Sequence, residues 1–139
     1  MNLIQKRDEL SKRYRDFVSD INDITLLDKL NQVPSEKAFW AMVLVDYERA
    51  LAKLESKRDK MIKSLSNEIV GKAPVVLTKI ALDNVKNDDS LQEINENIQE
   101  LKLCVSLFSK IYDNVRYIAR DFENILKFKQ LQELWNEKF

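Results

Sequence analysis

The clearest chemistry in this sequence belongs to a row of cationic side chains. At 100° per residue of an α-helix, five of them fall within an arc of about 120°: Arg49, Lys53, Lys57, Lys60 and Lys63. Such a row could neutralise the phosphates of a nucleic-acid backbone, which carries one negative charge per nucleotide. The alternative is that a solvent-facing helix carries lysine and arginine for solubility alone.

Catalytic and metal chemistry find little support in the residue types. The chain has no histidine, which removes histidine-activated nucleophiles, histidine-ligated metals and the usual neutral-pH general base. Gly71 is the only glycine, so a glycine-rich phosphate loop is excluded. Asp88 and Asp89 lie in a polar segment with nothing to desolvate them. We therefore predict no catalytic residue, no metal ligand and no cofactor, and a protein that is not an enzyme.

The cysteine content and hydropathy indicate a cytoplasmic protein. Cys104 is the only cysteine and lies in an apolar run, where a small core residue is expected rather than a reactive thiol. Met1–Arg15 lacks the apolar segment of a signal peptide. No run of about 18 uncharged apolar residues is present, so no membrane-spanning helix is expected.

Composition favours an all-α fold of long amphipathic helices, of the helical-hairpin or coiled-coil type, in one domain over residues 1–139. One glycine and two prolines are too few for the turns of a strand-rich fold. The net charge is zero, yet residues 35–79 hold nine basic and six acidic residues, and residues 80–103 hold two basic and six acidic ones. A neutral total can therefore conceal a basic face and an acidic face.

Three helical segments are expected. Residues 1–33 should hold a helix over Leu3–Val18, a break within Asp20–Asp28 and a short second helix. Pro34 disfavours helix at the residue before it and marks a boundary. A central helix carrying the basic face should then span residues 35–71, with Ser35 as its N-cap.

A third helix is expected over residues 90–135, opened by the capping box of Ser90 and Glu93. The connection before it is ambiguous, because Val75–Val85 fits a short strand or a short helix, and a turn follows at residues 87–89.

Three arginines need a separate interpretation. Arg58 interrupts the apolar stripe of the central helix and is expected to pair with a carboxylate across an interface. Arg116 and Arg120 offer a weaker second contact to a phosphate backbone, since Asp113 and Glu123 can neutralise them.

Apolar residues at alternating three- and four-residue steps form a seam along each long helix. In the central helix Trp40 and Tyr47 belong to the seam, and we expect them in the core, base stacking being the alternative. The C-terminal helix would be roughly 65–70 Å long, more than a small monomeric domain needs. We therefore expect a homo-oligomer, an extended monomeric hairpin being the alternative, held together by Leu101, Val105, Phe108, Tyr112, Val115, Phe122 and Leu126.

The order of these features resembles the UvsY-like recombination mediators of tailed bacteriophages. Four motifs occur at matching places along most of the chain: Ile24-Thr25-Leu26-Leu27, Lys37-Ala38-Phe39-Trp40, Lys53-Leu54-Glu55 and Ser90-Leu91-Gln92. Lys63 stands where the family has a basic residue implicated in DNA contact. The family has a second basic residue shortly after this one, and Leu65 stands at its place in this chain. Ser66-Asn67-Glu68 also departs from the family pattern.

The resemblance implies a function and partners. It implies a single-stranded-DNA-binding protein that helps load a RecA-like recombinase, in contact with that recombinase and with a single-strand-binding protein. It also implies assembly through the C-terminal helix into rings of six or seven subunits. The alternative, a coiled-coil adaptor or structural protein that binds a protein partner, requires no affinity for nucleic acid.

Overall fold

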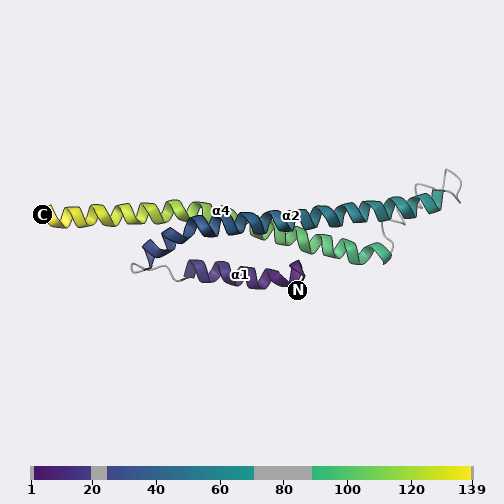
Figure 1. Ribbon diagram of the computed structural model, residues 1–139, viewed down its shortest axis with the longest axis horizontal. Helices are drawn as coiled ribbons and strands as arrows, with labels where there is room; N and C mark the ends of the chain where they lie inside the picture. The colour runs from purple at the N-terminus through teal and green to yellow at the C-terminus, as the bar shows by residue number, and fades with distance from the viewer. Residues whose placement is uncertain (1, 20–24, 71–88, 139) are drawn as a thin grey trace. The chain divides into compact units, whose positions relative to one another are not determined.

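The computed structural model describes residues 2–19, 25–70 and 89–138, and these residues form three α-helices and no strand. The helices are α1 (Leu3–Ser19), α2 (Leu26–Val70) and α4 (Asp89–Lys138) (Figure 1). The predicted all-α class is confirmed. The stop expected near Gly71 and the start expected near Ser90 stay predictions, because the residues between Val70 and Asp89 lie outside the described ranges. The ambiguous connection, apart from Asp89, lies outside the described residues.

Pro34 does not end a helix, and the predicted boundary there is wrong. Proline lacks an N–H group and crowds the carbonyl of the fourth residue before it, at a cost of about 3 kcal/mol. Burial of apolar residues nevertheless holds α2 together on both sides of Pro34. Before it, Leu26 and Val33 are buried with Phe17 and Phe122, and after it Trp40 is fully buried. Burial of each such side chain contributes roughly 1.5–3 kcal/mol, which offsets the lost hydrogen bond. Figure 1 therefore shows one continuous α2.

The helices contribute to two compact units, which are described separately. Unit 1 comprises Met1–Val45 and Val105–Phe139, and unit 2 comprises Asp46–Cys104. The prediction of a single domain over residues 1–139 stays a prediction.

Unit 1 has a core to which all three helices contribute. Phe17 of α1, Leu26 and Val33 of α2, and Phe122 of α4 form one buried cluster, with Val18, Leu30, Ile118 and Ala119 packed around it. Further along α2, Trp40 is fully buried. Its ring stacks on Phe108 at a centroid distance of 5.9 Å and meets Tyr14 edge-on at 6.2 Å. Because Tyr14 and Phe17 contact α2 in reverse order along the chain, α1 runs antiparallel to α2.

The core of unit 2 is aliphatic and less enclosed. Leu91, Ile94 and Ile98 of α4 are buried, and half-buried side chains of α2 cover them: Leu51, Leu54, Met61, Ile62 and Leu65. Apart from Ile62, these residues fall on the alternating three- and four-residue steps expected of the seams, which here face inward. Cys104 is fully buried and is not disulfide-bonded, as expected of a small core residue.

Candidate nucleic-acid interface

All five predicted cations lie on the exposed side of α2 within unit 2. Arg49, Lys53, Lys57, Lys60 and Lys63, called here the cationic row, belong to one uninterrupted helix. Fourteen residues at 1.5 Å per residue give the row a length of about 21 Å. The seam faces α4 and turns these side chains toward solvent, so the amphipathic pattern of α2 positions the row.

Small side chains allow three lysines to share one depression. A shallow hollow on α2 is lined by Ala52, Lys53, Ser56, Lys57 and Lys60. Ala52 and Ser56 are one turn apart, and their short side chains leave room between the longer lysines. The Ser56 hydroxyl adds a hydrogen-bond donor to the three ammonium groups. An anionic oxygen resting on this hollow would meet several donors at once.

The charges of the cationic row are not neutralised within the described part of the chain. No carboxylate of the described residues forms an ion pair with any of the five side chains. Three acids do lie close: Glu55 and Asp59 line a neighbouring hollow together with Lys60 and Lys63, and Glu93 of α4 lines another together with Lys57. The hollow around Lys53 is the part of the row that no acid lines.

Arg58 has a different role from the one predicted. Its side chain is 28% exposed, and its Nε atom bonds the Asp59 carboxylate of the same helix at 3.3 Å. The expected partner across an interface is thus replaced, in this structure, by the next residue. The ion pair with Arg58 also partly neutralises Asp59, one of the acids that border the cationic row.

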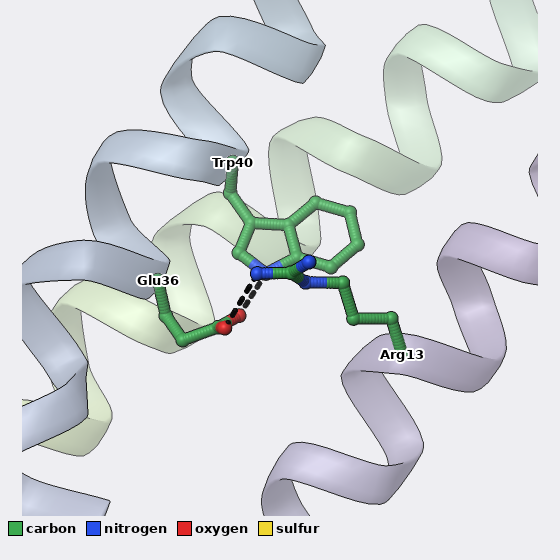
Figure 2. Close-up of polar contacts among 3 residues, drawn as sticks. All are labelled: Arg13, Glu36 and Trp40. Atoms are coloured by element: carbon green, nitrogen blue, oxygen red, sulfur yellow. Dashed lines mark hydrogen bonds and ion pairs between the residues drawn. The ribbon is translucent and has the colours of Figure 1, made fainter.

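The stacking role weighed for Trp40 and Tyr47 is contradicted by their burial. Trp40 is 0% and Tyr47 2% exposed, so neither ring can reach a nucleic-acid base. Figure 2 shows the polar contacts that Trp40 and its neighbours make. Its Nε1–H donates to Glu36 Oε2 at 3.1 Å, and Arg13 Nη2 of α1 donates to Glu36 Oε1 at 2.8 Å.

The Arg13–Glu36–Trp40 network was missed by the sequence reasoning. The Glu36 side chain is only 14% exposed, and the Arg13 guanidinium also lies 3.6 Å from the ring centroid of Phe39. The pair is 23 residues apart in the chain. Only the four-residue spacing of Glu36 and Trp40 could have suggested part of this network.

The predicted oligomerisation residues line the inner face of α4. Leu101, Phe108, Val115 and Phe122 are buried, and Val105, Tyr112 and Leu126 are half-buried. In unit 1, Phe108 contacts Trp40 and Phe122 joins the buried cluster. The chain's own helices therefore cover at least these two residues. Their role between copies stays a prediction.

Exposed apolar residues gather instead at the end of α4. Ile125, Phe128, Leu131, Leu134 and Trp135 are between 43% and 65% exposed. None of these five residues belongs to the predicted oligomerisation residues, which end at Leu126.

The weaker candidate site, around Arg116, has the neutralising neighbour that the sequence indicated. Arg116 pairs with Asp113 at 3.7 Å, and its guanidinium lies 5.8 Å from the Tyr112 ring centroid. Its charge is thus partly neutralised. The cationic row of unit 2 remains the stronger candidate for binding a polyanion.

The described residues offer neither a metal site nor a membrane-spanning helix. Among the described residues, no group of three or more His, Cys, Asp or Glu side chains could hold a metal ion. None of the described helices combines the length and apolar character needed to cross a membrane. No protein-family model, curated protein or solved structure matches the chain.

Proposed function

We propose that this protein binds single-stranded DNA through the cationic row and acts as a recombination mediator. The observation that carries the proposal is the set of five exposed cations on one straight helix, with no ion pair to a described carboxylate. A polyanion gains affinity from such a row by releasing condensed counterions. The exposed surface of the row offers no aromatic ring, so binding depends on the backbone and is independent of base sequence.

A single strand fits the row better than a duplex. The five cations are about 4.5–6 Å apart along the helix axis, at 1.5 Å per residue. A flexible strand can follow a straight line of cations, whereas each strand of a duplex winds away from it. The duplex would therefore reach fewer of the five side chains.

The mediator role rests on the resemblance to the UvsY-like family. It implies that a homo-oligomer holds the strand and passes it to a RecA-like recombinase, in the presence of a single-strand-binding protein. Assembly would also strengthen binding, since several rows in one particle raise the effective concentration of cations around one strand.

Salt-titrated binding tests the proposal. For a single strand, the logarithm of the binding constant falls with the logarithm of salt by about 0.7 per neutralised phosphate. Five contacts give a slope of about −3.5, so a short labelled strand should bind roughly 500-fold more weakly at 300 mM than at 50 mM salt. An affinity that does not change over this range would refute the electrostatic mechanism.

A pair of charge reversals links the binding to the row. Lys57→Glu with Lys60→Glu leaves three cations, so the slope should fall to about −2 and the affinity at 50 mM salt at least tenfold. The matched control is Lys102→Glu with Lys110→Glu, which changes the same charge at exposed positions of α4. Equal losses in both variants would show that net charge, rather than the cationic row, governs binding.

A protein-binding adaptor is the second candidate function, and the exposed apolar residues at the end of α4 favour it. An adaptor would leave the cationic row merely solvated. Charge reversal at Lys57 and Lys60 would then leave the binding of a protein partner unchanged, and single-stranded DNA would not bind at 50 mM salt.

A further inference from the structure

The end of α4 carries an apolar face that the described chain leaves uncovered. Phe128, Leu131 and Trp135, called here the tail face, are 62%, 64% and 65% exposed. Ile125 and Leu134 flank them and are also exposed. Beyond Phe122, the only described side chains of α4 that are half-buried rather than exposed are Leu126 and Lys129.

The tail face lies on the other side of the helix from the seam of α4. The seam steps through Phe122 and Leu126 and then reaches Lys129 and Glu133, which are charged. At 100° per residue, the tail face is about 120–180° around the helix from Phe122 and Leu126. The helices that cover Phe122 in unit 1 therefore cannot also cover the tail face.

The exposed end of α4 gains little stability from packing within the chain. Sixteen residues follow Phe122 in α4, and most helical stability in proteins comes from the packing of an apolar face rather than from helix propensity. Aromatic side chains bury 150–250 Å² each when covered, so the five exposed apolar side chains offer roughly 500 Å² per copy. Two such faces together would bury about 1,000 Å², the lower limit for a specific interface.

We propose that the tail face binds the tail face of a second copy of the chain, with the two helices antiparallel. Asn124 and Gln132, which border the face, are uncharged, and Lys127 borders it on the other side. An antiparallel pair offsets the two Lys127 side chains along the helix axis, whereas a parallel pair would set them at the same level. The proposal deepens the homo-oligomer of the proposed function by naming its contact surface, and it does not depend on DNA binding.

Asp121 determines the orientation. It lies seven residues before Phe128 and so continues the tail face toward the N-terminus of α4. A parallel pair would place Asp121 against its own copy in an apolar seam, which is unfavourable. An antiparallel pair centred near residue 130 sets Phe128 against Leu131 of the other copy and leaves Asp121 in water at the end of the pair.

Sedimentation of the full chain tests the contact. Phe128→Asp with Leu131→Asp should convert a dimer into a monomer at 10 μM, with a rise in the dimer Kd of roughly 100-fold or more. The control, Gln130→Asp with Asn136→Asp, adds the same charge at exposed positions away from the tail face and should remain dimeric. A wild-type monomer at this concentration overturns the proposal, as does an assembly that survives the tail-face substitutions.

Spin-label distances test the orientation. A label on Glu137→Cys should give a backbone separation of about 24 Å in the antiparallel pair and about 10 Å in a parallel one. The wild-type chain serves as control, because its only cysteine is fully buried. A separation near 10 Å, or a ring of six or seven subunits, overturns the antiparallel pair. Binding of a short single strand by the tail-face variant separates this failure from failure of the proposed function, since the cationic row is intact.

Discussion

The two compact units differ in how completely the apolar face of α2 is buried. In unit 1 a third helix, α1, covers α2, and the aromatic side chain of Trp40 becomes fully buried. In unit 2 the seam residues of α2 from Leu51 to Leu65 stay half-buried, and among the described helices only α4 packs against them. We therefore expect unit 1 to contribute more to stability, whereas the described part of unit 2 leaves one face of α2 exposed.

The largest expected effect is loss of the aromatic centre of unit 1. Trp40→Ala removes a fully buried ring that contacts Tyr14, Phe39 and Phe108. We expect the free energy of unfolding to fall by about 3–5 kcal/mol, measured by urea titration followed by circular dichroism. A loss below 1 kcal/mol would mean that unit 1 does not dominate stability.

Removal of the half-buried Glu36 carboxylate should have the next largest effect. Glu36→Ala leaves the indole N–H of Trp40 and the Arg13 guanidinium without their acceptor, at a cost of about 1–3 kcal/mol. Glu36→Gln keeps one acceptor and should recover part of this loss. Identical stabilities of the two variants in urea titration would show that the hydrogen bonds contribute nothing beyond packing.

A seam residue of unit 2 should matter less than Trp40. Leu54 is half-buried against α4, so Leu54→Ala should destabilise by about 1–2 kcal/mol, less than a fully buried leucine would. The same urea titration applies. A cost equal to that of Trp40→Ala would contradict the proposed difference between the two units.

The smallest effect on stability is expected at the cationic row. Lys57→Glu with Lys60→Glu changes two exposed side chains, and the free energy of unfolding should stay within about 0.5 kcal/mol of the wild type. The same variant should lose most of its affinity for single strands. A large destabilisation would indicate that the row has a structural rather than a binding role.

The repeat of apolar residues predicted most of the fold. It located α1, α2 and α4 and their inward faces, since a three- and four-residue alternation directly reports which side of a helix is buried. It also predicted that the cationic row would be exposed. Local rules were less successful at Pro34, where the helix-breaking tendency of proline was outweighed by the burial of Leu26 and Val33.

The sequence by itself determined that the described residues are helical and which of them face inward, because these properties depend on near neighbours in the chain. Only the tertiary structure decided what each inward face packs against. It joined Arg13 to Glu36 across 23 residues, covered Phe108 and Phe122 with the chain's own helices, and left the tail face open. Periodicity shows that a face must be buried, but the covering surface depends on contacts between residues distant in the chain.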